Sequence, residues 1–350
     1  MTQTTLYSGV LAKIGAERSK LLKEAKLKTL TECKNLTELT AQLRDTSYQA
    51  QILKVPLPLT SRKLERAFNE HLIETHAKII KHSPKKAAKY LDLYFLRLEV
   101  ENIKTLLKAT NANQSTEQKL VKVYLSVEDY LQNRAVIEEA AKASSLRQVA
   151  NVFKNTEYAL ALNMGLQSYE ESGSTMRLDV FLDKLFYEKL FNGYTSLPQN
   201  EKPHAQFYAR MENDGFTLLT LLRGKALNHD ANWLRLTIPS ENFNLSAETV
   251  EALVSAGDFE FALKIALESK YASFFVKAQN PEETIANAEK AFKRAVFQHA
   301  KASRVTETFN IGVALAFLTQ KDAEVYNLTV LSLGVEAAMK PEDIQSKLLV

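Results

Sequence analysis

The sequence is poor in the residues that cross-link a chain or interrupt its elements. Among 350 residues there are one cysteine, eight prolines and ten glycines. The single cysteine, Cys33, excludes a disulfide framework and any zinc site built on cysteine ligands. A chain of this length buries enough apolar surface to fold without such cross-links. Because glycine and proline punctuate structure, their scarcity indicates long, uninterrupted elements.

Long apolar runs and a strong net charge are also missing. The longest apolar run covers residues 311–318, whereas a membrane-spanning helix needs about 20 residues. The composition is 25% charged and 45% apolar, which excludes wholesale disorder. The net charge of +4 suits an acidic partner without identifying one. We therefore expect a soluble, intracellular protein.

The stretches between the prolines predict an all-α fold. They are rich in leucine, alanine, lysine, glutamate and glutamine, which favour helices. Residues 64–80 and 91–107 place apolar side chains three and four positions apart, the spacing of one helix face. Strand-like alternation is nearly absent. Residues 233–238 form the single short strand candidate, and an irregular loop explains that segment equally well.

Two sets of short motifs recur with a similar period. In the first set, a tyrosine follows a leading leucine or phenylalanine by twelve positions. In the second set, an acidic residue is followed three positions later by an amide or hydroxyl residue on the same helix face. We interpret these acids as structural contacts to a basic residue or a helix terminus of a neighbouring repeat. The motif residues are Tyr48, Tyr158 and Tyr271 in the first set, and Glu99 with Asn102, Asp214 with Thr217 and Glu324 with Asn327 in the second.

The order of the two sets along the chain predicts how its ends meet. The chain begins with a tyrosine motif and ends with an acidic motif. We therefore predict two full repeats, 60–165 and 176–275, and a third made of residues 281–350 completed by residues 1–55. An open solenoid would leave two apolar faces exposed at its ends. The complementary ends predict instead a closed, pseudo-three-fold arrangement in which the first and last helices pack together.

The search for chemistry is negative. The sequence contains neither a phosphate-binding loop nor a dinucleotide fingerprint. His71 and His76 are five positions apart, which places them on different faces of a helix, so we expect surface histidines and no metal pair. Glu99 and Glu101 also point apart and cannot flank one bond. We expect no catalytic, cofactor-binding or metal-binding residues.

Two basic runs leave alternatives open. A solvated helix face is the simpler interpretation. The other is a docking face for an acidic partner, for anionic lipid headgroups or for nucleic acid. Nucleic acid is disfavoured because aromatic residues are not interleaved with the basic ones. The candidate docking residues are Lys13, Arg18 and Lys20 in the first run, and Lys78, Lys81, Lys85 and Lys86 in the second.

Four segments carry a family resemblance that spans nearly the whole chain. Residues 91–107, LDLYFLRLEVENIKTLL, resemble the central signature of the C subunit of archaeal and bacterial A/V-type ATP synthases. That protein is related to the d subunit of eukaryotic vacuolar ATPases. Residues 314–328 and 340–348 resemble its last repeat and its closing helix, and residues 36–48 resemble its first tyrosine segment.

The resemblance implies an all-α funnel with pseudo-three-fold symmetry and no active site of its own. It implies a single copy at the cytoplasmic face of the membrane, peripheral to it. There the protein joins the central-stalk subunits to the membrane rotor ring and transmits torque for ATP synthesis or ion pumping. Two other functions stay open: a helical-repeat scaffold for protein interactions, and a helical nucleic-acid-binding protein that uses the basic faces.

Overall fold

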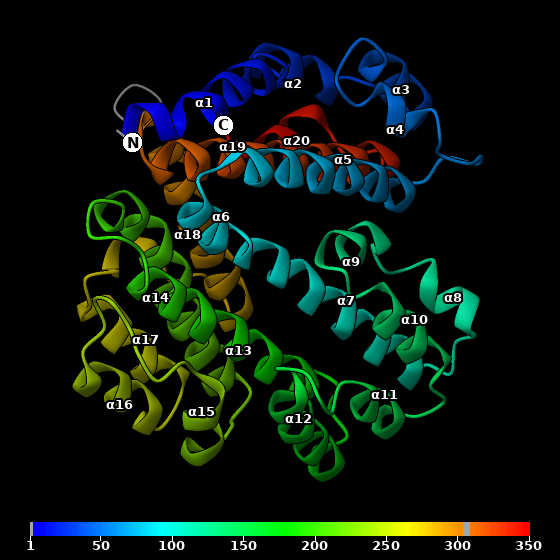
Figure 1. Cartoon of the computed structure of the whole chain (residues 1–350). Coiled ribbons are helices and arrows are strands. Elements are labelled where there is room, and N and C mark those ends of the chain that lie inside the picture. The colour runs from blue at the N-terminus through cyan, green and yellow to red at the C-terminus, as the bar shows by residue number, and fades with distance from the viewer. Residues whose placement is uncertain (1–2, 304–308) are drawn as a thin grey trace. The chain divides into compact units, whose positions relative to one another are not determined.

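The computed structural model describes residues 3–303 and 309–350, which form helices and no strand (Figure 1). The predicted all-α class is therefore confirmed. In this part of the chain, no helix combines the length and apolar character needed to cross a membrane. The chain forms two compact units. Unit 1 contains Met1–Ala88 and Val296–Val350, and unit 2 contains Lys89–Ala295.

Unit 1 is assembled from both ends of the chain. Two helices, α6 (Lys85–Leu91) and α18 (Pro281–Ala302), contain the points where the chain passes between the units. The helices that lie wholly in unit 1 are α1 (Gln3–Arg18), α2 (Glu24–Thr31), α3 (Leu36–Leu43), α4 (Gln49–Ile52), α5 (Ser61–His82), α19 (Ile311–Glu336) and α20 (Pro341–Lys347).

Unit 2 contains the middle of the chain. Its helices are α7 (Leu93–Asn111), α8 (Thr116–Leu120), α9 (Leu125–Leu131), α10 (Arg134–Lys142), α11 (Leu146–Val152), α12 (Ala159–Ser172), α13 (Met176–Thr195), α14 (Lys202–Ala226), α15 (Ala231–Thr237), α16 (Ala247–Ser255) and α17 (Phe259–Glu268), followed by the 3₁₀ turn η1 (Ala272–Phe274). Helix α13 packs against α7, α12 and α14.

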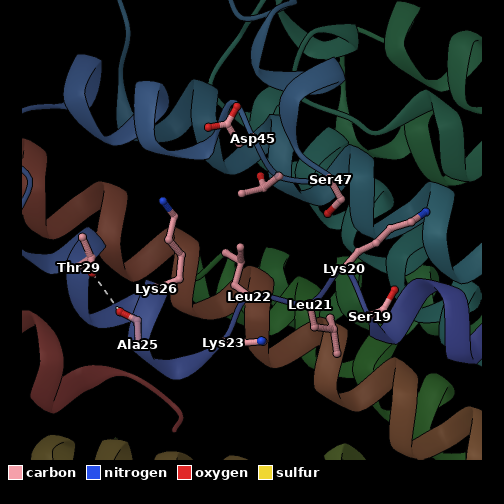
Figure 2. Close-up of a pocket in the computed structure, with 11 residues that line it drawn as sticks. Ser19, Lys20, Leu21, Leu22, Lys23, Ala25, Lys26, Thr29, Asp45 and Ser47 are labelled. Atoms are coloured by element: carbon pink, nitrogen blue, oxygen red, sulfur yellow. Dashed lines mark hydrogen bonds between the residues drawn. The ribbon is translucent and has the colours of Figure 1, made fainter.

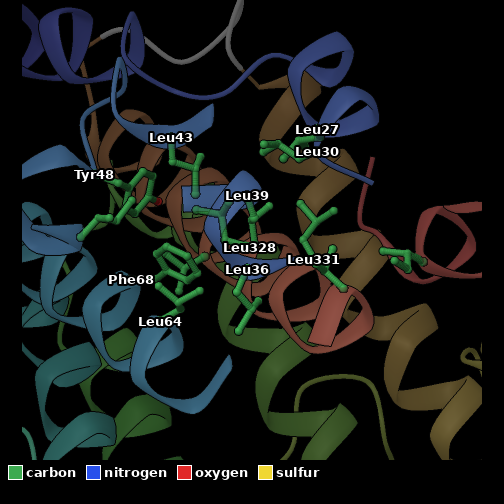
Figure 3. Packing of buried hydrophobic residues seen from close by; sticks show 14 of the residues in the cluster. Leu27, Leu30, Leu36, Leu39, Leu43, Tyr48, Leu64, Phe68, Leu328 and Leu331 are labelled. Atoms are coloured by element: carbon green, nitrogen blue, oxygen red, sulfur yellow. The ribbon is translucent and has the colours of Figure 1, made fainter. Parts of the chain in front are cut away.

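The core of unit 1 joins segments that are far apart in the sequence. Helix α5 packs along α19, and α1 packs on both of them. Helix α2, near the start of the chain, packs on α19 and on α20, near its end. Buried side chains from the two chain ends meet in one cluster, among them Leu39, Phe68 and Leu328 (Figure 3). Apolar burial thus holds the two ends of the chain together.

Local signals explain where the main helices begin. Thr60 caps α5 by accepting a hydrogen bond from the Lys63 N–H.

The strand candidate at residues 233–238 was wrong, because most of it lies in α15. Asp230 caps this helix by accepting from the Trp233 N–H, and Leu234 points into the core. The three repeat boundaries and the closed funnel stay predictions.

Helices α12 and α13 pack closely against each other at Gly165. A Cβ atom at this position would lie 3.0 Å from the Leu178 carbonyl oxygen, which belongs to the backbone and cannot rotate away. We expect Gly165→Val to lower the free energy of unfolding by about 1–3 kcal/mol, because the added atoms overpack the contact. Urea unfolding would measure the change. Gly15→Val is the matched control, since no atom lies within 4 Å of a Cβ there. An equal loss in both variants would contradict the overpacking argument.

Candidate functional site

The three repeated tyrosines pair with the three repeated acids. Tyr158 donates a hydrogen bond to Glu99, and Tyr271 donates to Asp214 over 2.6 Å, both within unit 2. In unit 1, Tyr48 donates to Glu324 over 2.7 Å. The partners are 59, 57 and 276 positions apart, respectively. The same contact therefore forms locally twice and once between the two ends of the chain.

Each acid also binds the segment that leads into a short helix. Glu324 accepts from the Leu22 N–H before α2. Glu99 accepts from the Asn133 side chain over 2.7 Å, at the start of α10. Asp214 accepts from the N–H groups of residues 243 and 244 over 2.8 and 2.7 Å, ahead of α16. Each acid thus ties a long helix to two places in the shorter segments of the chain.

Two of the three residues that stand three positions after the acids bind the backbone of another segment through both a donor and an acceptor. The Asn102 amide accepts from the Tyr124 N–H and donates to the Tyr124 carbonyl, over 2.8 and 3.0 Å. The Asn327 amide likewise accepts from the Leu349 N–H over 2.7 Å and donates to the Leu349 carbonyl over 2.9 Å. Thr217 differs: it donates over 2.8 Å to the side chain of Asn242. Thr217 therefore bonds to a side chain at the place where each asparagine makes two hydrogen bonds to the backbone of another segment.

Burial determines the protonation state of the tyrosine hydroxyls in these contacts. It raises the pKa of the Tyr48, Tyr158 and Tyr271 hydroxyls well above the ordinary value, and the negative charge of the partner acid raises each pKa further. Each hydroxyl therefore stays protonated and acts as a hydrogen-bond donor. These geometries suit structural contacts. The tyrosine partner itself was missed, although the common spacing of the two motif sets pointed to it.

The contact in unit 1 contains a buried lysine that the other two lack. Lys321 is 2% exposed, and its ammonium lies 2.6 Å from Glu324 and 2.8 Å from the Tyr48 hydroxyl. Burial lowers the pKa of Lys321, and the neighbouring Glu324 carboxylate opposes that shift. Leu96 and Met211 stand at the corresponding place, three positions before Glu99 and Asp214. The contact between the chain ends is thus a buried ion pair.

The structure brings part of the two basic runs together. Lys20 of the first run and Lys78 of the second both bind Glu17, a carboxylate that is 8% exposed. Burial raises the pKa of Glu17, but the hydrogen bonds from Lys78 and Lys20 outweigh it and hold the pKa below the ordinary value. Of the other candidates, Lys13 and Arg18 are half-buried, and Lys81, Lys85 and Lys86 are exposed.

A buried acid in α9 had no counterpart in the sequence patterns. Glu128 is fully buried in unit 2. One of its oxygens accepts from Asn102 over 2.7 Å, and within the described part of the chain the other oxygen has no hydrogen-bond partner. Burial raises the pKa of Glu128 to about 8; the Asn102 hydrogen bond lowers it, and Glu99 and Asp129 raise it further.

The histidines do not form a metal site. Among the described residues, no group of three or more histidine, cysteine, aspartate or glutamate side chains is arranged to hold a metal ion. The surface position expected for His76 was wrong: it is 3% exposed, and its Nε2 lies 3.2 Å from Asp322. The His71 ring packs 4.5 Å from the Tyr48 ring, and burial lowers its pKa to about 3.

Comparison with known proteins identifies the family. The family model described as ATP synthase (C/AC39) subunit matches residues 10–347. The C subunit of the A-type ATP synthase of Methanocaldococcus jannaschii is 27% identical, over 98% of this chain and 86% of the relative. The equivalent proteins of Thermococcus kodakarensis and Pyrococcus abyssi are 24% and 25% identical, each over 97% of this chain and 90% of the relative. The match of the family model over nearly the whole length shows that this chain belongs to the ATP synthase (C/AC39) subunit family.

Proposed function

We propose that this chain is a non-catalytic subunit of an A-type ATP synthase that couples the central shaft to the membrane rotor ring. The nearly full-length match to the family is the observation that carries the proposal. In this role the chain transmits torque during ATP synthesis or ion pumping. Its partners are the central-stalk subunits and the rotor ring, and one copy lies at the cytoplasmic face of the membrane.

The internal contacts suit a part that carries mechanical load. Close-packed interiors resist compression and pass strain to their neighbours. Each tyrosine–acid contact ties a long helix to the segments beside it, so force on one element reaches the next through buried hydrogen bonds. We further propose that the contacts mark three repeats closed into a funnel. The exposed residues Lys81, Lys85 and Lys86 would contribute a docking face for neighbouring subunits.

Affinity purification of the tagged chain from native membranes in mild detergent tests the proposed assembly. We expect stalk and rotor-ring subunits to be recovered with it. The coupling role has a separate test in membrane vesicles from cells that lack the chain. There we expect ATP hydrolysis to persist while ion transport is lost. Recovery of the chain alone, or ion transport that persists without it, would contradict the proposal.

A further inference from the structure

A basic groove lies in unit 1 between the end of α1, the start of α2 and the loop after α3 (Figure 2). Its volume is about 530 Å³. Its lining includes three lysines, Lys20, Lys23 and Lys26, and one acidic residue, Asp45. Unit 1 as a whole contains 21 lysines and arginines against 14 aspartates and glutamates, whereas unit 2 contains 24 against 27. The groove therefore lies in the basic unit and is itself basic.

Several donors in the groove are not used by the described chain. The Lys23 ammonium has no partner there, and Lys26 donates only to the neutral Gln42, over 2.9 Å. Helix α2 begins without a side-chain cap: the N–H groups of Lys26 and Leu27 donate to the Lys23 carbonyl, but no side chain caps those of Glu24 and Ala25. The Ser47 hydroxyl is shielded from solvent and also lacks a partner within the described residues. A ligand rich in acceptor oxygens would complement the two ammonium groups.

The shape of the groove favours an extended ligand over a single small anion. Figure 2 shows the Lys20 and Lys26 side chains diverging from each other, so they do not converge on one point. Leu21 and Leu22 contribute apolar surface between them. The volume lies in the range of grooves that accept molecules much larger than one phosphate group. Lysines that are spread along a partly apolar groove suit a peptide that carries several carboxylates along its length.

We propose that this groove docks an acidic segment of a protein partner, with carboxylates placed against Lys23, Lys26 and the start of α2. The proposal rests on the chain being part of a larger assembly, as proposed above. It adds the chemistry of the segment that this surface recognises. Electrostatic complementarity of this kind steers association and selects partners.

A fluorescein-labelled hexaglutamate peptide provides a direct test with the purified full-length chain. We expect its fluorescence anisotropy to report saturable binding that weakens as salt is added. The double variant Lys23→Glu and Lys26→Glu should weaken binding by about tenfold or more, because it reverses two charges that face the peptide. Ser47→Ala should weaken it by about twofold to threefold, the loss of one hydrogen bond. An acid at position 23 suits the start of a helix, so the fold should be retained.

The matched control is the double variant Lys54→Glu and Lys340→Glu, which makes the same charge change at two exposed lysines of the same unit outside the groove. We expect it to leave peptide binding within about twofold of the unaltered chain. Equal losses in both double variants would overturn the proposal, because net charge alone would then explain binding. Absence of peptide binding would also overturn it, even if the chain still co-purifies with stalk and ring subunits. Binding to phosphatidylserine vesicles that depends on Lys23 and Lys26, without peptide binding, would assign the groove to lipid instead.

Discussion

Glu324→Gln is expected to lower the free energy of unfolding by about 3 kcal/mol, because it leaves the Lys321 ammonium buried without a carboxylate. Lys321 is 2% exposed and contacts Glu324 at 2.6 Å. The new amide would also direct a donor toward the Leu22 N–H, or turn one toward the lysine, so no orientation satisfies all its neighbours. Urea unfolding followed by circular dichroism would measure the loss.

Glu99→Gln is the matched control for this prediction. Glu99 makes the same contact to a tyrosine and to an amide donor, but within the described residues no lysine forms an ion pair with it. We expect it to cost only about 1 kcal/mol, the loss of charge assistance in those hydrogen bonds. Adding Lys321→Met to Glu324→Gln should recover much of the stability, since methionine stands at the corresponding position 211. Similar losses for Glu99→Gln and Glu324→Gln would show that the buried lysine does not matter.

Glu128→Gln is expected to stabilise the protein increasingly as the pH rises from about 4.5 to 8. Burial raises the pKa of Glu128 in the folded state to about 8, while the unfolded chain has the ordinary value near 4.5. The folded state therefore binds the extra proton, and stability falls with rising pH across that interval. Glutamine removes this loss because it carries no charge. We expect a gain of about 4 kcal/mol at pH 8 and almost none at pH 4.

Urea unfolding at a series of pH values would measure this gain. Glu139→Gln on α10 is a suitable control, because Glu139 is 60% exposed and forms a surface ion pair with Lys142. We expect it to change stability by less than about 0.5 kcal/mol at every pH. Charged and titratable groups around Glu128 also include Glu99 on α7, Asp129 on its own helix and Tyr158. A gain from Glu128→Gln that is independent of pH would contradict a protonated Glu128.

Periodicity predicted more of the fold than of its polar contacts. Apolar spacing identified the helices at 64–80 and 91–107, because burial of one face decides whether such a segment is helical. The strand candidate at 233–238 failed because a cap at Asp230 outweighed the β-branched and aromatic composition. The repeated acids and tyrosines were found, but hydrogen-bond partners 57 or more positions apart depend on tertiary packing that spacing does not describe. Glu128 stands outside any repeated pattern, so its burial was invisible in the sequence.

Because unit 1 is built from both ends of the chain, it cannot be completed until the last residues have been synthesised. Leu39 and Phe68 are made early, but the cluster in which they are buried also needs Leu328. More than 200 residues of unit 2 must be added between Ala88 and Val296, which takes about 10 to 40 s at typical rates of translation. During that interval the apolar faces of α2, α3 and α5 lack their final partners. Unit 2 can therefore fold first, while the start of the chain is the part that needs protection on the ribosome.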